Sequence, residues 1–368
     1  KFNGRKTTSL RVSEKEINKE KITEAQFDAL RTSALRVSIT QRRLKKGLIG
    51  SVSKLQGISF IPITSVGCYV PGGQARYPSS AIMSAITAAE AGVKRIVITS
   101  PPGPDGKIDP MTITVAKKCG AEIYKVGGAQ AIGALAYGTK SIPKVDKIVG
   151  PGGKFVSIAK LIVSEQISID MIAGPTELGI LADATADPEL VALDLISQAE
   201  HSNDTMCFVI TTSKTVAKQI QKSLEKLIPD VERSAIVKQS ISKNGFIAVC
   251  KNQKEVIDLA NKIAPEHMEL MVKNAKTLSK SITGPGLVLI GNNTPSSASD
   301  YLLGTNHILP TSGFGRTRGG LSVLDFLKLQ TVIATKKSDL SEISDKLKIL
   351  TDAEGLPNHY KAVERRLK

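Results

Sequence analysis

The chain has 368 residues, of which 41% are hydrophobic, and at about 150 residues per domain this length indicates two or three domains. No apolar run approaches the ~18 residues needed to cross a membrane, so a membrane-spanning protein is excluded. Lys and Arg number 50 against 34 Asp and Glu, a net charge of +16, but the basic residues are scattered and no Trp is present to stack bases, so we interpret the charge as a solvated surface rather than a nucleic-acid site.

The four cysteines lie far apart and none belongs to a CxxC pair: Cys68, Cys119, Cys207 and Cys250. They indicate neither a thiolate metal site nor a disulfide framework, and they fit a reducing compartment. The chain opens at Lys1 without the residue order of a secretory signal, so we expect a cytoplasmic protein. Because it begins in the middle of a pattern, we also expect that an amino-terminal segment is missing.

The first predicted element is a long amphipathic helix from Thr23 to Lys46. Thr23 and Gln26 have the spacing of a capping box, in which two side chains satisfy the first N–H groups of a helix. The apolar residues that follow at helical spacing are Phe27, Leu30, Ala34 and Val37.

From about residue 58, short apolar strands alternate with helices, which is typical of parallel sheets covered on both faces. A first α/β unit is expected from strands at 59–67, 95–100, 121–128 and 147–153, and from helices at 80–91, 111–119, 132–137 and from 155 onward. A second unit is expected from strands at 174–183, 206–212, 245–250, 268–272 and 286–291, and from helices at 188–201, 215–227 and 253–263. Beyond about Leu321 strands largely stop, and two helices are predicted, at 340–353 and from Pro357.

Glycine-rich turns follow several predicted strands. There is no GxGxxG, and although Gly133 and Gly138 have Walker spacing, Thr139 stands where the lysine should be. The turns are YVPGG at 69–73, VGGAQ at 126–130 and GPGG at 150–153. One such turn has about even odds of serving geometry alone, but three at the carboxyl ends of strands favour a ligand.

Gln198 and His201 lie three residues apart at the end of a predicted helix, so their side chains share a face. An amide oxygen beside an imidazole is half of a workable metal site. The alternative is a histidine that only interacts with the helix dipole at its carboxyl end, and the two residues alone do not decide between them.

Glu266 and His267 follow Pro265, which disfavours helical geometry at Ala264, so we expect a turn between helix and strand here. A carboxylate beside an imidazole offers a base for water and a proton shuttle near neutral pH. A solvated turn is the alternative for this dipeptide taken alone. Further on, Asp300 with His307 and Glu354 with His359 add oxygen and nitrogen donors. Gln198, His201, Asp300 and His359 would make a mixed set of the kind zinc accepts, if the fold united them.

In chain order, eight motifs resemble those of the histidinol dehydrogenase family over nearly the whole chain. They are SVGCYVPGG, GGAQAIGALAYGT, PKVDKIVGPGG, DMIAGPTE, LISQAEH, PEHMEL, GTNHILPT and AEGLPNH. The resemblance implies a zinc-dependent enzyme that uses two NAD to oxidise L-histidinol through L-histidinaldehyde to L-histidine, the last steps of histidine biosynthesis. The rival interpretations are a zinc hydrolase and a basic nucleic-acid-binding protein.

The resemblance also implies roles for individual residues. The zinc ligands would be Gln198, His201, Asp300 and His359. The acid/base pair would be His267, which takes the hydroxyl proton in the first oxidation, and Glu266, which activates water in the second. Substrate would be contacted by Thr176, Gln198, His201, His267, Asp300, His307, Glu354 and His359. NAD would be contacted by Tyr69, Gln130 and the position of Gly153, where many relatives have Asn; Thr176 replaces a commoner Ser.

For the fold, the expectation is α/β, with two incomplete Rossmann-like domains of doubly wound, mostly parallel sheet and a small helical carboxyl-terminal appendage. Residues 1–68 with 177–320 would form the first domain, 69–176 the second, and 321–368 a dimerisation segment. In the homodimer that the family implies, this segment would bring Glu354 and His359 to the neighbouring subunit's site.

Overall fold

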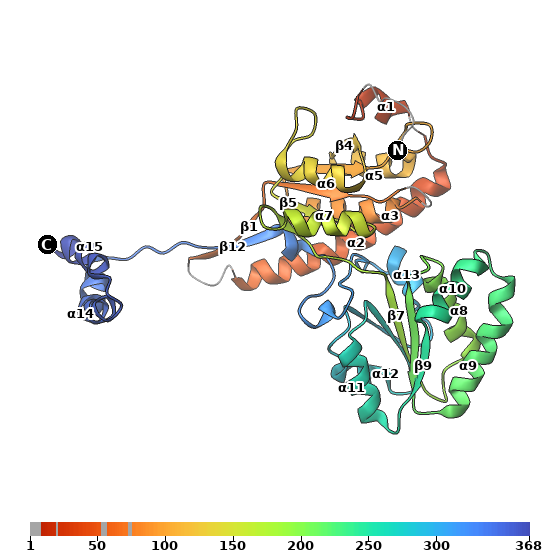
Figure 1. The fold of residues 1–368 in the computed structure, drawn as a ribbon. Coiled ribbons are helices and arrows are strands. Elements are labelled where there is room, and N and C mark those ends of the chain that lie inside the picture. Colours follow the sequence, from red (N-terminus) through yellow and green to blue (C-terminus); the bar gives the residue numbers. More distant parts are fainter. Residues whose placement is uncertain (1–8, 20, 53–56, 73–75) are drawn as a thin grey trace. The chain divides into compact units, whose positions relative to one another are not determined.

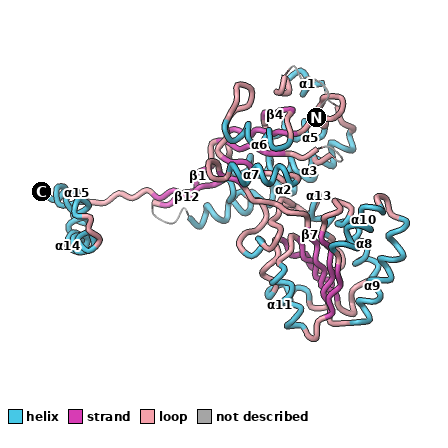
Figure 2. The backbone as a smooth tube through the Cα atoms, viewed as in Figure 1, coloured by secondary structure: helices cyan, strands magenta, loops and turns pink. Residues whose placement is uncertain are grey.

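The computed structural model describes residues 9–19, 21–52, 57–72 and 76–368. By its internal contacts the chain divides into two units, Lys1–Gly47 with Pro62–Lys328, and Leu48–Ile61 with Leu329–Lys368. The first unit contains two five-stranded sheets flanked by helices (Figure 1). In Figure 2 the strands of these sheets are magenta and the surrounding helices cyan. No helix among the described residues is long and apolar enough to span a membrane.

The first sheet has the strand order β4-β3-β2-β5-β6, and all its pairs are parallel. Its strands are β2 (Ser65–Tyr69), β3 (Arg95–Ser100), β4 (Glu122–Lys125), β5 (Lys147–Val149) and β6 (Ser168–Ile169). Ile96 and Ile98 pack in one core cluster, while Val97 between them packs in another. Successive residues thus face opposite covered sides, which explains why these strands are continuous apolar runs.

The helices of this half begin with α1 (Glu14–Lys19) and α2 (Glu24–Val52). Then follow α3 (Pro78–Ala81), a π-helical turn (Ile82–Ile86), α4 (Thr87–Ala91), α5 (Pro110–Cys119), α6 (Gly128–Tyr137) and α7 (Lys154–Val163). The predicted capping box is confirmed, because the Thr23 N–H donates to Gln26 Oε1 (3.0 Å) and the Gln26 N–H donates to Thr23 Oγ1 (3.1 Å). The helix it opens continues past the predicted end at Lys46.

The second sheet has the order β11-β10-β7-β8-β9, again with parallel pairs. Its strands are β7 (Glu177–Ala182), β8 (Met206–Thr211), β9 (Phe246–Val249), β10 (His267–Met271) and β11 (Leu287–Ile290). Its helices are α8 (Pro188–Ala199), α9 (Lys214–Leu227), α10 (Ser234–Asn244), α11 (Gln253–Ile263), α12 (Ala275–Leu278) and α13 (Ser296–Tyr301). Short 3₁₀ turns occur at Ile228–Asp230, Ser279–Ser281, Phe314–Arg316 and Val323–Phe326.

Both sheets are built in the same way, which confirms the predicted Rossmann-like architecture. In each, the chain begins at the central strand, adds two strands on one side and then crosses to add two on the other. The order therefore reverses between β2 and β5 in one sheet and between β7 and β10 in the other. Crevices at such switch points are where open α/β sheets bind ligands.

The arrangement of residues 58–69 differs from the expected domain division at residue 68. One strand was predicted at 59–67, but β1 (Ile58–Pro62) pairs with β12 (Leu327–Thr331), and β2 pairs with β3 and β5. Pro62 has no N–H to donate from within a central strand, and the break between β1 and β2 follows it. Leu30, Ala34 and Val37 of α2 also pack in the core cluster of the first sheet, so the amino-terminal helix covers that sheet and not the one at 177–320.

The carboxyl-terminal segment consists of α14 (Lys337–Ala353) and α15 (Pro357–Leu367). Pro357 begins the second helix, as predicted. The Lys348 ammonium lies 5.6 Å from the centre of the Tyr360 ring. α15 buries no residue, and α14 buries only Ser344 and Thr351. These two helices therefore have almost no apolar core of their own.

Candidate active site

A cavity of about 430 Å³ lies where the carboxyl edge of the first sheet meets the amino edge of the second. The first sheet contributes the turns after β2 and β5, with Pro71, Gly72, Pro151, Gly152 and Gly153, and the start of the next helix, with Tyr77, Ser79 and Ser80. The second sheet and its helices contribute Thr176, Gln198, His201, Glu266, His267, Asp300, Tyr301 and His307. The cavity thus unites seven of the predicted catalytic, metal and substrate residues with Gly153.

Glu266 and His267 reach the same cavity because the backbone before β10 is not helical. Ala264 ends α11 with φ 50° and ψ 59°, so it leaves the helical region as expected, although it enters the left-handed rather than the extended region. The His267 ring then lies between two carboxylates. Its Nδ1 is 3.9 Å from Glu266 Oε2, and its Nε2 is 3.3 Å from Asp300 Oδ1.

These contacts set the proton affinity of His267. Burial by itself lowers the pKa of the imidazole, but the hydrogen bond to Asp300 and the negative charges of Glu266 and Asp300 outweigh burial and raise the pKa to about 9. The surroundings therefore stabilise the imidazolium form. Once it has given up its proton, a histidine in this setting is a strong base, because the two carboxylates favour its reprotonation.

A chain of hydrogen bonds fixes the carboxylate of Glu266. Gln198 Nε2 donates to Thr176 Oγ1 (2.6 Å), and the Thr176 hydroxyl donates to Glu266 Oε2. The same carboxylate oxygen accepts the backbone N–H of Glu177 (3.1 Å). Burial raises the pKa of Glu266, while the charge of His267 and these hydrogen bonds lower it, and the net direction is upward. A raised pKa makes this carboxylate a stronger base.

His201 and His307 each use one ring nitrogen to bind a backbone carbonyl. His201 Nδ1 lies 3.0 Å from the Gln198 oxygen, and His307 Nδ1 lies 2.8 Å from the Asp300 oxygen. If each Nδ1 carries the proton and donates it, each Nε2 holds a lone pair. That of His201 is left for a metal ion or substrate, whereas His307 Nε2 lies 3.4 Å from the Ser80 hydroxyl. Burial lowers the pKa of His307, which favours this neutral form.

The predicted zinc ligands are only partly assembled within the first unit. Among the described residues, no group of three or more His, Cys, Asp or Glu is placed to hold a metal ion. Gln198, His201 and Asp300 nevertheless line one cavity. Since Gln198 Nε2 donates to Thr176, its Oε1 is the amide atom left for a metal ion, so the donor atoms present fit zinc chemically. Glu354 and His359 belong to the second unit.

The predicted NAD-contacting residues lie at or after the carboxyl ends of three strands of the first sheet. Tyr69 ends β2 and is buried, and its hydroxyl accepts the N–H of Gly128 (3.0 Å), so it supports the VGGAQ turn. Gln130 is exposed in the first turn of α6. Gly153 precedes α7 at the cavity, where a Cβ atom would meet nothing within 4 Å. Gly73, of the YVPGG turn, lies outside the described residues.

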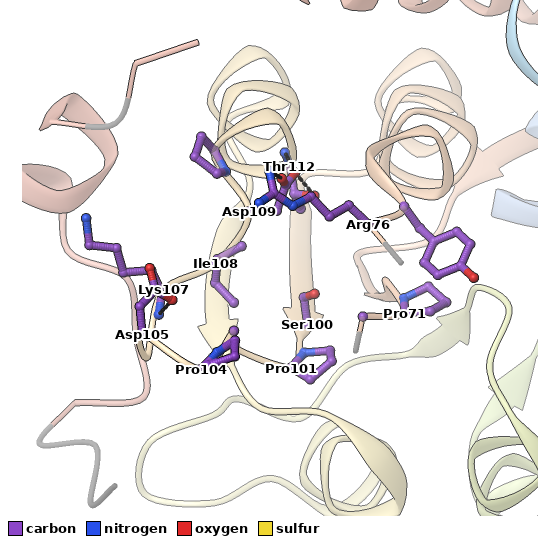
Figure 3. Close-up of a pocket in the computed structure, with 14 residues that line it drawn as sticks. Pro71, Arg76, Ser100, Pro101, Pro104, Asp105, Lys107, Ile108, Asp109 and Thr112 are labelled. Carbon is purple, nitrogen blue, oxygen red and sulfur yellow. Dashed lines mark hydrogen bonds and ion pairs between the residues drawn. The ribbon is translucent and has the colours of Figure 1, made fainter. Parts of the chain in front are cut away.

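A second cavity of about 510 Å³ adjoins the first and shares Pro71, Gly72 and Tyr77 with it. It lies between the segments that follow β2 and β3, and Figure 3 shows Arg76 extending toward Asp109 there, with the guanidinium 3.6 Å from the carboxylate. Together the cavities give room for an elongated ligand along the carboxyl edge of the first sheet.

From the sequence alone, no role is predicted for the residues that support this site. Lys160 and Asp170 form a buried ion pair, and both hold Gly150: Lys160 Nζ donates to its oxygen (3.0 Å) and Asp170 Oδ2 accepts its N–H (2.7 Å). Glu177 lies against Glu266. The only sign of these residues in the sequence is a charge next to a buried apolar run. Their partners lie far away in the sequence, so the sequence does not indicate what they contact.

A family model described as histidinol dehydrogenase matches residues 1–367. A histidinol dehydrogenase from Oceanobacillus iheyensis is 43% identical over 351 residues, which cover 94% of this chain and 82% of that protein. One from Methanococcus maripaludis is 42% identical over 375 residues, covering 100% and 88%. The crystal structure of histidinol dehydrogenase from Elizabethkingia anophelis is similar with a TM-score of 0.92 and 34% identity, covering 100% of this chain and 86% of that one.

Proposed function

The chain belongs to the histidinol dehydrogenase family, and we propose that it oxidises L-histidinol in two steps, through L-histidinaldehyde to L-histidine, with zinc and two molecules of NAD. It is an NAD-dependent dehydrogenase of histidine biosynthesis. The observation that carries the two-step proposal is that Glu266 and His267 line one cavity with Gln198, His201 and Asp300.

We propose that zinc is held by Gln198, His201 and Asp300, with His359 as the fourth ligand. When bound, zinc supplies a template that anchors the imidazole and amine of the substrate and orients its alcohol carbon. Thr176, His307 and Glu354 would contact substrate beside it. The hydrogen bonds of Gln198 and His201 support this assignment because they leave Oε1 and Nε2 as the unused donor atoms.

In the first oxidation, His267 takes the hydroxyl proton while the alcohol carbon gives up a hydride to NAD. The contacts with Glu266 and Asp300 favour the imidazolium that results. The aldehyde product stays in the cavity, which prevents the release of a reactive intermediate.

In the second oxidation, Glu266 removes a proton from a water molecule that attacks the retained aldehyde, and the hydrate gives up a hydride to a second NAD. The Thr176 hydroxyl and the Glu177 N–H hold one carboxylate oxygen of Glu266, so the other oxygen is the one left to take a proton from water. For the nucleotide we propose contacts at Tyr69, Gln130 and Gly153. Tyr69 and Gly153 lie at the carboxyl ends of β2 and β5, the two strands of the switch point, and the open space at Gly153 supports this placement.

We also propose that the enzyme is a cytoplasmic homodimer in which each carboxyl-terminal segment completes the site of the partner subunit. The near absence of buried residues in α14 and α15 supports this, because such helices need another surface to pack on. All four cysteines are free, in keeping with a reducing compartment.

One assay tests the proposed function. Histidinol is added to the purified protein with NAD and zinc, and reduced nicotinamide is measured against histidinol consumed. Two equivalents per histidinol are expected. No reduction under any metal condition would reject the proposal, and turnover of a zinc-dependent hydrolase substrate without nicotinamide would favour a hydrolase instead.

A further inference from the structure

Glu177 is a buried carboxyl group next to the proposed water-activating residue. It is the first residue of β7, and it contacts the segment before β10. Its Oε2 accepts the backbone N–H of Glu266 (3.2 Å), while its own backbone N–H donates to the carboxylate of Glu266 (3.1 Å). The two glutamates are thus joined reciprocally, each side chain to the other backbone.

The second oxygen of Glu177 holds another segment of the site. Oε1 accepts the backbone N–H of Ser312 (3.0 Å). Ser312 has φ 56°, in the left-handed region that costs a non-glycine residue free energy and persists only where neighbours fix it. The preceding residue, Thr311, accepts the N–H of Gly174 with its hydroxyl (2.7 Å). One carboxylate therefore ties the backbone at Ser312 to the backbone at Glu266.

The backbone of Glu266 is held from both sides. Glu177 takes its N–H, and its carbonyl oxygen accepts the N–H of Leu287 in the neighbouring strand (2.9 Å). Pro265 has no N–H, so the N–H of Glu266 is the next one that the segment leading into β10 can donate. The Glu177 carboxylate accepts it. With the backbone fixed, the Glu266 carboxylate is directed at Thr176.

We propose that Glu177 is a positioning residue that fixes the orientation of the Glu266 carboxylate and thereby sets the rate of the second oxidation. The proposal rests on the proposed function of Glu266 as the base for water. The Glu177 side chain does not line the cavity and acts through the backbone of Glu266 and Ser312.

The ionisation of Glu177 gives the proposal a signature that plain structural damage lacks. Burial raises the pKa of Glu177 to about 7, against the N–H groups of Ser312 and Glu266, which lower it; the charge of Glu266 raises it and that of His267 lowers it. Above this pKa both oxygens accept an N–H. As the pH falls through about 7, one oxygen gains a proton and becomes a donor, so its hold on an N–H is lost.

The test compares Glu177→Gln with Asp183→Asn. Asp183 follows the other end of β7 and also bridges two backbone N–H groups, those of Thr185 (2.8 Å) and Lys273 (2.9 Å), but it lies at the opposite edge of the sheet. Histidinol and separately supplied histidinaldehyde are each assayed with NAD from about pH 5 to pH 9. In Glu177→Gln we expect kcat for the aldehyde to fall about 10- to 100-fold relative to the single-turnover rate of hydride transfer from histidinol, a loss of the size seen when outer partners of metal ligands are removed.

The aldehyde KM should stay within about twofold of wild type, and the ionisation near pH 7 should disappear from the aldehyde profile. Asp183→Asn should keep the wild-type ratio and profile. Equal losses in both steps, or an unchanged profile in Glu177→Gln, would overturn the proposal. If Glu177→Gln does not unfold cooperatively, Glu177→Asp replaces it, and an unchanged ratio and profile there would overturn the proposal as well. A wild-type protein that reduces no NAD with either substrate would instead refute the proposed function itself, and this inference with it.

Discussion

The hydroxyl of Thr176 donates a hydrogen bond to the carboxylate of Glu266, which lies 90 residues away in the sequence. The same hydroxyl accepts a hydrogen bond from the Gln198 amide. One small side chain thus connects a proposed zinc ligand with the proposed base of the second oxidation. It also decides which atoms of both groups remain free for the reaction.

Replacing this hydroxyl should impair the second oxidation selectively. Thr176→Val keeps the shape but leaves the buried Gln198 amide without its acceptor, which costs about 1–3 kcal/mol of stability. Glu266 Oε2 then keeps only the N–H of Glu177. We expect a lower melting temperature and, in single turnovers, a larger loss in the rate of hydride transfer from histidinaldehyde than from histidinol. Thr176→Ser, which keeps the hydroxyl, is the control and should stay close to wild type. Equal behaviour of the Val and Ser variants would contradict the role of the hydrogen bond.

Substitutions of the two acid/base residues should differ in which oxidation step they impair. His267→Asn should weaken both oxidations, since the hydroxyl of the alcohol and that of the hydrate both lose a proton. Glu266→Gln should chiefly impair conversion of added histidinaldehyde, by about 10²- to 10⁴-fold. Stopped-flow measurement of each half-reaction distinguishes them. Wild-type aldehyde rates in Glu266→Gln would exclude it as the base for water.

Sharing of the site between subunits can be tested by mixing two inactive variants. His201→Ala and His359→Ala should each lower the zinc bound per chain, measured by elemental analysis. If the carboxyl-terminal segment completes the partner's site, a heterodimer of the two variants has one intact site. Random mixing should then restore about a quarter of wild-type activity and zinc content, since half the dimers are mixed. No recovery would indicate that each chain supplies all its own ligands.

The nucleotide site can be tested by adding a side chain. Gly153 has φ −67° and open space at Cβ, so Gly153→Asn should fold normally and lower the KM for NAD. Gly150→Asn is the matched control in the same turn. Gly150 has φ 117°, and a Cβ there would lie 2.1 Å from the Tyr69 oxygen, so that variant should lose stability. An unchanged KM for NAD in Gly153→Asn would place the nucleotide elsewhere.

The buried ion pair beneath the GPGG turn should be costly to break. Lys160→Met leaves Asp170 charged and buried without its partner, and such changes cost about 3–5 kcal/mol. We expect a large drop in the free energy of unfolding by denaturant titration. Met at position 160 combined with Asn at position 170 should recover part of the loss. If Lys160→Met is as stable as wild type, the ion pair contributes nothing to the free energy of unfolding.

Local features of this protein were determined by its sequence alone. The capping box at Thr23, the strand and helix order, the turn at Pro265 and the helix begun by Pro357 depend on residues a few positions apart, whose geometry is set by backbone sterics and nearby hydrogen bonds. The motifs were also sufficient to indicate the family.

Only the tertiary structure decided which distant residues meet. Residues 65–69 form β2 of the first sheet. Their apolar pattern suits a strand of either sheet, because strand pairing depends on the order in which strands assemble and not on that pattern. For the same reason, the sequence could name Gln198 and Glu266 as candidates but could not join them through Thr176. Glu177 has no local sign of a role, since its partners at Glu266 and Ser312 become neighbours only when β7 and β10 pair.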